Sequence, residues 1–208
     1  MKQLTKELWE RQDQHRGDRL RLFTAVGQTV DAHTVLYPGS FVDVAPSFVF
    51  PAVTYLDEDS RAARFFADAE GVDQIVGEHR TDRAGTEVRF LHGDYGTDVG
   101  IAPHSFDLLV SLYAGFVSEY CTHYLRIGGT LLVNPSHGDA AMAAIDTRYA
   151  LSGVIESRSG DYRVGRSNLH SYLVPKKEQS VTPDLLHRTG RGVGYTKSPF
   201  AYLFTRIA

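Results

Sequence analysis

The chain has 208 residues, of which 42% are hydrophobic and 23% charged, a composition that fits one globular domain with a substantial buried core. Its single cysteine, Cys121, excludes an internal disulfide framework and a cysteine-based zinc site, which favours a reducing compartment, and we expect a cytoplasmic protein. The charged N-terminus is unlike a signal peptide, and no stretch approaches the roughly 20 apolar residues of a membrane helix, so no membrane association is expected.

The formal net charge of −3 is unevenly distributed along the chain. Residues 1–150 contain 13 Lys and Arg against 21 Asp and Glu, a net charge of −8, while residues 151–208 contain 9 against 4, a net charge of +5. A strong attraction of the whole surface to nucleic acid is therefore not expected. The basic C-terminal segment fits either a solvated surface or a site for an anionic partner.

The elements before residue 150 alternate between strands and helices. Leu4, Leu8 and Trp9, with charged residues between them, predict an amphipathic helix over residues 4–15, within an N-terminal helical extension of residues 1–30. The strands that follow are expected at 34–37, 53–56, 87–91, 106–112 and 130–134, and the helices at 60–67, 72–79, 116–126 and 138–146. This order predicts a parallel, doubly wound α/β sheet, because parallel neighbours require crossover connections that place helices on both faces.

The pattern changes after residue 150. Strand-like segments at 151–157, 168–173 and 200–206 are separated by glycine-rich loops, which predicts that the last part of the sheet is antiparallel. We therefore expect a single domain over residues 1–208, with 151–208 as its antiparallel C-terminal part.

Ligands of doubly wound sheets bind outside the carboxyl ends of the strands. The four predicted loops at that edge supply the candidate cofactor residues Tyr37, Gly39, Ser40, Asp43, Asp57, Glu58, Asp94, Tyr95 and Ser111. Gly39 would let the backbone approach a ligand, and Asp43 could accept hydrogen bonds from an ammonium group. Asp57 could accept both hydroxyls of a ribose, while Asp94 could accept an adenine amine beside the aromatic ring of Tyr95.

The order of these features resembles the class I S-adenosylmethionine-dependent methyltransferase family over roughly residues 30–206. The most specific motifs are Phe-Asp-Leu-Leu-Val before the fourth loop and Leu-Arg-Ile-Gly-Gly-Thr-Leu-Leu-Val into the fifth strand. The resemblance implies a Rossmann-like, mostly parallel, seven-stranded sheet whose antiparallel final strand, 200–206, lies beside the fifth. It also implies S-adenosylmethionine as cofactor across the first four loops. By position, Gly39 matches the first glycine of the cofactor loop, Asp57 the ribose-binding acid and Asp94 the adenine-binding acid.

The first loop departs from the family pattern. Tyr37 stands where the family usually has an acidic residue, and Phe41 and Asp43 occupy glycine positions. This loop motivates a second hypothesis, a catalytically inactive methyltransferase-like binding or regulatory module. A third is a Rossmann-type enzyme with another nucleotide, although a nicotinamide cofactor is disfavoured because residues 37–43 lack the Gly-x-Gly-x-x-Gly pattern.

The first hypothesis is a methyltransferase that acts on an acceptor the sequence does not identify. Methyl transfer to oxygen or nitrogen needs alignment of the two reactants and is helped by a general base. His137 and Tyr113 are the candidate catalytic residues, and Asp139 is close enough in sequence to orient His137. The histidine spacings do not match a known metal site, and no metal is predicted.

Overall fold

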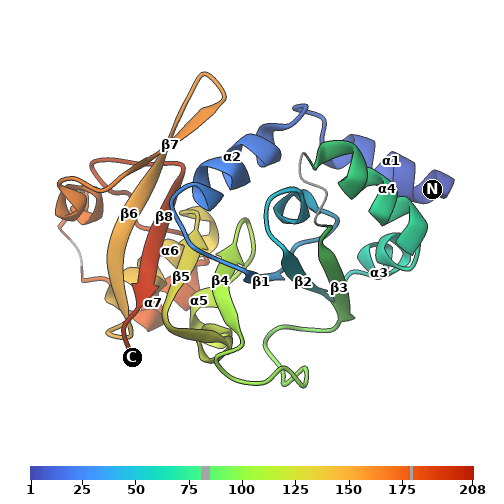
Figure 1. The fold of residues 1–208 in the computed structure, drawn as a ribbon. Coiled ribbons are helices and arrows are strands. Elements are labelled where there is room, and N and C mark those ends of the chain that lie inside the picture. Colours follow the sequence, from blue (N-terminus) through green and yellow to red (C-terminus); the bar gives the residue numbers. More distant parts are fainter. Residues whose placement is uncertain (81–84, 179) are drawn as a thin grey trace.

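The computed structural model describes residues 1–80, 85–178 and 180–208, and these residues are organised around one mixed β-sheet (Figure 1). Within them the sheet has eight strands, in the order β3-β2-β1-β4-β5-β8-β6-β7. The strands are Thr34–Pro38 (β1), Ala52–Asp57 (β2), Glu87–His92 (β3), Phe106–Ser111 (β4), Leu125–Val133 (β5), Tyr149–Arg158 (β6), Asp161–Gly165 (β7) and Ala201–Arg206 (β8).

The strand directions confirm the predicted fold class. Strands β1 to β5 pair in parallel, and β8 runs antiparallel between β5 and β6. The sheet has one strand more than the seven expected, because β6 and β7 form an antiparallel hairpin. Ser159 and Gly160 connect the two strands, and both have the positive φ angles that two-residue hairpin turns require.

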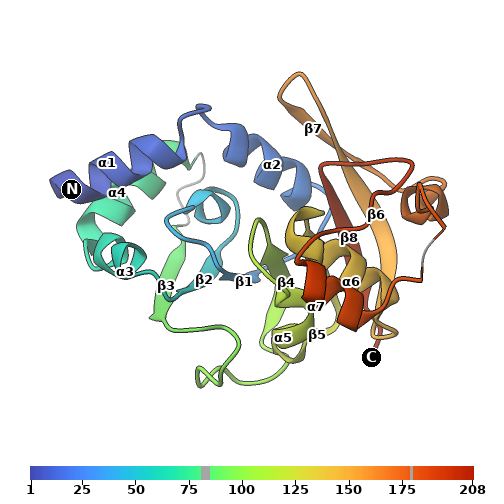
Figure 2. The ribbon, with the colours of Figure 1, turned by 180° about the vertical axis from the view of Figure 1, so that it is seen from behind.

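Helices cover both faces of the sheet (Figures 1 and 2). Side chains of α2, α3 and α4 share one buried cluster with β1, β2 and β4, whereas those of α5, α6 and α7 belong to the cluster on the other face. The helices are Gln3–Gln12 (α1), Asp18–Gly27 (α2), Ser60–Phe66 (α3), Ala69–His79 (α4), Val117–Tyr120 (α5), Asp139–Ile145 (α6) and Pro183–Thr189 (α7). Among the described residues, none of these helices combines the length and apolar character needed to cross a membrane.

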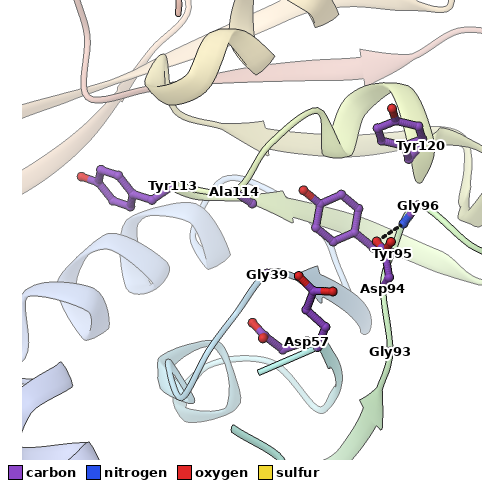
Figure 3. A pocket seen from close by; sticks show the side chains of 10 residues that line it. Gly39, Asp57, Gly93, Asp94, Tyr95, Gly96, Tyr113, Ala114 and Tyr120 are labelled. Carbon is purple, nitrogen blue, oxygen red and sulfur yellow. Dashed lines mark hydrogen bonds between the residues drawn. The ribbon is translucent and has the colours of Figure 1, made fainter. Parts of the chain in front are cut away.

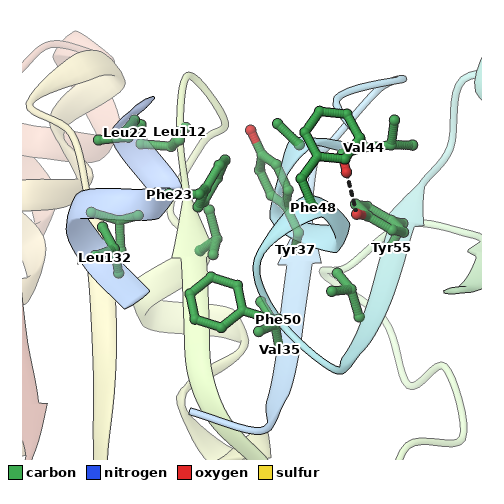
Figure 4. Close-up of a cluster of buried hydrophobic side chains, with 14 of the residues drawn as sticks. Leu22, Phe23, Val35, Tyr37, Val44, Phe48, Phe50, Tyr55, Leu112 and Leu132 are labelled. Carbon is green, nitrogen blue, oxygen red and sulfur yellow. Dashed lines mark hydrogen bonds between the residues drawn. The ribbon is translucent and has the colours of Figure 1, made fainter. Parts of the chain in front are cut away.

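An aromatic cluster between α2 and the sheet fixes the positions of β1 and β2 (Figure 4). The ring of Phe23 lies 6.3 Å from that of Tyr37 and packs edge-on, at 6.5 Å, against Phe50. The Tyr55 hydroxyl donates to the carbonyl of Val44 at 3.2 Å, so this buried phenol has a hydrogen-bond partner. Side chains on both sides of the β1–β2 connection are thereby held in one core.

The connection between β1 and β2 is unusual for parallel neighbours. Residues 39–51 contain one 3-10 turn, Ala45–Phe48, and no α-helix, although parallel strands are commonly joined through a helix. Two helices pack against this turn, α4 and α2, and α2 precedes β1 in the chain. The N-terminal extension therefore covers the sheet where a crossover helix would otherwise lie.

The N-terminal extension contains two helices rather than the single one expected over residues 4–15. Gly17, with φ +74°, separates α1 from α2. Asp68, at the start of α4, holds α1 in place because its carboxylate accepts hydrogen bonds from the Lys2 amide and the Thr5 hydroxyl, at 2.5 and 2.7 Å.

Two predictions for the second half of the chain are wrong in detail. The segment 168–173, expected as a strand, contains the 3-10 turn Leu169–Leu173, which follows Asn168 in a left-handed conformation. The helix expected over 116–126 is split into α5 and the 3-10 turn Thr122–Tyr124, after which β5 begins earlier than predicted.

Helix α7 lies in the part of the chain where no helix was predicted. The Thr182 hydroxyl accepts a hydrogen bond from the Leu185 amide, Pro183 is the first helical residue, and Gly190 with φ +56° ends the helix. These are ordinary helix-boundary signals, so the sequence contained the evidence for this helix.

Candidate functional site

A cavity of about 510 Å³ opens at the carboxyl ends of β1, β2, β3 and β4 (Figure 3). Its volume falls within the range of about 300–1,000 Å³ that small-molecule sites occupy. The residues that line it are Gly39, Asp57, Glu58, Gly93, Asp94, Tyr95, Gly96, Tyr113, Ala114 and Tyr120. Six of the sequence-predicted site residues are among them, namely Gly39, Asp57, Glu58, Asp94, Tyr95 and Tyr113.

Backbone hydrogen bonds align the starts of the loops that follow β1, β2 and β3. The Gly39 amide donates to Leu56 at 2.8 Å, which extends the β1–β2 ladder by one residue beyond β1. The Gly93 amide donates to the backbone carbonyl of Asp57 at 3.1 Å and extends the β2–β3 ladder in the same way. Because these bonds continue the parallel ladders, the side chains that follow each strand meet at one edge of the sheet.

Three carboxylates give one end of the cavity an acidic character. Asp57 is nearly buried, and its two oxygens accept hydrogen bonds from the amides of Phe41 and Asp59 at 2.7 and 2.8 Å. Since a carboxylate has about four acceptor positions, Asp57 keeps capacity for a ligand while it also holds the first loop. Glu58 and Asp94 are exposed, and Asp94 accepts the Gly96 amide at 2.8 Å, which shapes the third loop.

Tyrosines form the remaining walls. The Tyr95 hydroxyl accepts a hydrogen bond from the Gly115 amide at 3.1 Å, and its ring lies 6.3 Å from that of Tyr120. Burial raises the pKa of Tyr95, so its hydroxyl stays protonated at neutral pH. Tyr113 is 53% exposed, and Figure 3 shows its side chain extending away from Tyr95 and Asp57.

Gly39 allows the first and fourth loops to touch. Its φ of +64° is in the left-handed region, and a β-carbon built on it would lie 2.8 Å from the β-carbon of Ala114. The close approach predicted for this glycine is therefore to Ala114, at a point where both residues line the cavity. Phe41 turns its ring under the guanidinium of Arg61, at 4.9 Å, and is not one of the lining residues.

The structure places four of the predicted cofactor residues in the interior rather than at the cavity. Tyr37 is on the face of β1 that points into the aromatic core, and its hydroxyl donates to Asp43 at 3.2 Å. Asp43 is 2% exposed and forms an ion pair with Arg19, so it cannot receive an ammonium group from a ligand. Ser111 donates to Asp139, and Ser40 is buried with no hydrogen-bond partner for its hydroxyl among the described residues.

The predicted pairing of His137 with Asp139 is wrong. Asp139 is fully buried and accepts hydrogen bonds from Ser111 and Ser118, whereas His137 is exposed and its Nδ1 lies 2.5 Å from the Ser136 hydroxyl. The left-handed conformations of His137 and of Gly138, with φ +56° and +92°, turn the side chains of His137 and Asp139 in different directions. A catalytic role for His137 stays a prediction.

Arg19 and Tyr120 are the site residues that the sequence reasoning missed. The guanidinium carbon of Arg19 lies 5.1 Å from the centre of the Tyr113 ring. Burial lowers the pKa of Arg19, but the effects of Tyr37, Asp43 and other neighbours outweigh it and the pKa is raised, so Arg19 is a cation. Arg19 belongs to α2, far from any strand-to-helix loop, and no local sequence signal points to it.

Arg206 in β8 is buried, whereas the other eight basic side chains of the C-terminal segment are exposed, and none of these eight forms an ion pair with a carboxylate in the described part of the chain. They are Arg158, Arg163, Arg166, Lys176, Lys177, Arg188, Arg191 and Lys197. An anionic partner for this segment stays a prediction. Among the described residues, no group of three or more His, Cys, Asp and Glu side chains is arranged to hold a metal ion.

Comparison with known proteins gives similarity of structure only. No protein-family model and no curated protein matches the sequence. A candidate O-methyltransferase from Klebsiella pneumoniae has a TM-score of 0.50 at 13% identity, over 100% of this chain and 91% of that chain. A protein from Corynebacterium glutamicum also has a TM-score of 0.50, at 12% identity and over the same shares. A candidate S-adenosyl-L-methionine-dependent methyltransferase from Methanococcus maripaludis has a TM-score of 0.46 at 14% identity, over 64% of this chain and 65% of that chain.

At these identities the similarity concerns the fold. Together with the strand order and the antiparallel β8, it shows a Rossmann-like α/β fold similar to that of the candidate O-methyltransferase.

Proposed function

We propose that this protein binds S-adenosylmethionine and transfers its methyl group to an acceptor. The observation that carries the proposal is the cavity at the carboxyl ends of β1 to β4, which combines three carboxylates with three tyrosines in a methyltransferase-type fold. Nucleoside ligands offer hydroxyl and amine donors for carboxylates and a flat ring for tyrosines.

The donor set of the cavity fits the adenosine part of this cofactor. Asp57 and Glu58 would accept the ribose hydroxyls, and Asp94 would accept the adenine amine. Tyr95 and Tyr120 would provide an apolar surface for the adenine ring. These assignments follow the roles that the sequence predicted for Asp57, Asp94 and Tyr95, and they give Glu58, a candidate cofactor residue without a stated role, a place beside the ribose.

The amino-acid part of the cofactor would extend toward the Gly39–Ala114 contact. When bound, the cofactor supplies an electrophilic methyl group, and the protein has to align an oxygen or nitrogen nucleophile with it. Tyr113, exposed beside Ala114, and His137 are the residues of this chain that we propose to remove the proton of the acceptor.

The alternative is a methyltransferase-like module that binds without catalysis. The observation that favours it is in the first loop. The Asp43 carboxylate there is paired with Arg19 and accepts a hydrogen bond from Tyr37, so it is not accessible to a ligand. A cofactor that binds but is not turned over with any acceptor would support this alternative.

Isothermal titration calorimetry with S-adenosylmethionine and S-adenosylhomocysteine tests the proposal. Asp94→Asn should weaken both ligands about tenfold or more, because a hydrogen bond to a charged group contributes roughly 1.5–3 kcal/mol. The amide oxygen of the substituted side chain can still accept a hydrogen bond from the Gly96 amide, so the loop should persist.

Asp98→Asn is the matched control. Asp98 is also exposed, accepts the Gly100 amide at 2.9 Å in the same kind of turn, and is outside the lining of the cavity. We expect this variant to bind like the wild type. Wild-type protein whose Kd for both ligands is weaker than about 1 mM would refute the proposed function.

A further inference from the structure

Arg19 presents an unused edge of its guanidinium group next to the cavity. Its Nε lies 3.4 Å from an oxygen of Asp43, and its side chain is 20% exposed. Within residues 1–80, 85–178 and 180–208, no hydrogen bond engages Nη1 or Nη2. Both Nη atoms reach solvent, so this edge of the guanidinium group is open to a ligand group.

Asp43 fixes the guanidinium without covering the free edge. The Asp43 carboxylate is buried, and it also accepts hydrogen bonds from the Tyr37 hydroxyl and the Ala45 amide. The shortest contact of the ion pair is the one made by Nε, while the ring of Tyr113 lies along the guanidinium. An arginine held in this way is preorganised, so little conformational entropy is lost when it binds an anion.

The charges around the cavity are separated along the edge of the sheet. Asp57, Glu58 and Asp94 line one end, and Arg19 reaches the other end beside Tyr113. Figure 3 shows Ala114, which closely approaches Gly39, between Tyr113 and Tyr95.

We propose that the methyl acceptor carries a carboxylate group, which the Nη edge of Arg19 binds beside Tyr113. The proposal rests on the proposed function. A carboxylate matches two parallel N–H donors of a guanidinium, and such charge-assisted pairs are stronger than neutral hydrogen bonds. With adenosine at the acidic end, Arg19 lies beside Tyr113, whose exposed side chain extends away from Asp57 and Tyr95, where an acceptor can enter.

The probe for this site is benzoate, with benzamide as its neutral counterpart, titrated by ligand-detected NMR. Both compounds offer the same aromatic ring to Tyr113, so a difference between them reports the charge. The protein is first saturated with methylthioadenosine, which has no amino-acid part, and in a parallel arm with S-adenosylhomocysteine, which has its own carboxylate. We expect benzoate to bind at least about tenfold more tightly than benzamide in both arms.

Arg19→Met should weaken benzoate about tenfold or more and leave benzamide unchanged. Because this variant strands the buried Asp43 carboxylate, the double variant Arg19→Met/Asp43→Asn provides a version without an unpaired buried charge. Arg21→Met is the matched control, since Arg21 belongs to the same helix and its guanidinium bonds the carbonyls of Arg16 and Gly160. It should bind benzoate like the wild type.

Three results would overturn the inference: equal binding of benzoate and benzamide, retention of benzoate binding in the double variant, or loss of benzoate binding in the S-adenosylhomocysteine arm alone. The last would assign Arg19 to the carboxylate of the cofactor itself. Titration of the same preparations with S-adenosylhomocysteine keeps the two proposals apart. A protein that does not bind this ligand fails the proposed function, whereas one that binds it but not benzoate fails only the assignment of Arg19.

Discussion

The buried carboxyl group of Asp139 should make the stability of this protein depend on pH. Asp139 begins α6 and accepts hydrogen bonds from the Ser111 hydroxyl and from the hydroxyl and amide of Ser118, so it ties the loop after β4 to the one after β5. In the described part of the chain it forms no ion pair with a basic side chain. Burial raises its pKa to about 6, against the opposing effect of these hydrogen bonds.

The size and sign of the effect follow from the difference between the folded and unfolded pKa values. The ordinary pKa of an aspartate is 3.8, and that of Asp139 in the folded protein is about 6. At 1.36 kcal/mol per pH unit, this difference makes the folded protein about 3 kcal/mol more stable with Asp139 protonated than with Asp139 ionised. Because the pKa is raised in the folded protein, this stabilisation is complete below about pH 4 and is lost as the pH rises through 6.

Asp139→Asn should remove this part of the pH dependence. The amide has the shape of a protonated carboxyl group and no charge, and the hydroxyls of Ser111 and Ser118 can donate or accept. Urea unfolding at a series of pH values between 4 and 7 should show that the wild type loses about 3 kcal/mol more stability than the variant across this range. Ser118→Ala should extend the loss of stability to higher pH and enlarge it, because it removes a hydrogen bond that lowers the pKa of Asp139. Parallel pH profiles for wild type and Asp139→Asn would refute the argument.

Two predictions concern the first loop, both measured by urea unfolding. Gly39→Ala should destabilise the protein by about 2 kcal/mol or more, because a side chain at φ +64° costs roughly 1–2 kcal/mol and the new methyl group also overlaps the fourth loop. Gly77 lies in α4, and a β-carbon added there would meet no neighbouring atom within 4 Å. Gly77→Ala should therefore stabilise the protein by about 0.5–1 kcal/mol. Similar effects of the two substitutions would contradict this reasoning. Asp57→Ala should lower the free energy of unfolding by about 1–3 kcal/mol and also weaken ligand binding, because the amides of Phe41 and Asp59 lose their acceptor. An unchanged stability would contradict the role of Asp57 in holding the loop.

The parallel part of the fold could be predicted because each element has a local signal. Apolar runs such as 106–112 are bounded by turn residues, and Asp59, a residue type that favours the N-cap position, caps α3. The errors lie where tertiary contacts decide the structure. The alternating side chains of 168–173 are compatible with a strand, but Asn168 adopts a left-handed conformation and the segment forms a 3-10 turn instead.

The site was predictable to the level of the loops but not of the side chains. Asp57 and Asp94 follow β2 and β3 and reach the cavity, as their positions after the strands suggested. Tyr37 belongs to β1 itself, where alternation of side chains turns it into the core, and it takes Asp43 with it through a hydrogen bond. Arg19 comes from a helix before the first strand, and only the folded chain shows it beside Tyr113.

The position of Arg19 is related to the β1–β2 connection, because α2, which contains Arg19, packs against that connection. The N-terminus of an α-helix that follows a strand can bind an anion through its free amides and its dipole. Residues 39–51 contain no α-helix, so the first loop has no such positive end to offer a ligand. α2 packs against this connection instead and carries Arg19 to the edge of the sheet. Arg19 thus brings positive charge to the end of the cavity beside Tyr113, and replacing it should remove anion binding there without altering the acidic end that we assign to adenosine.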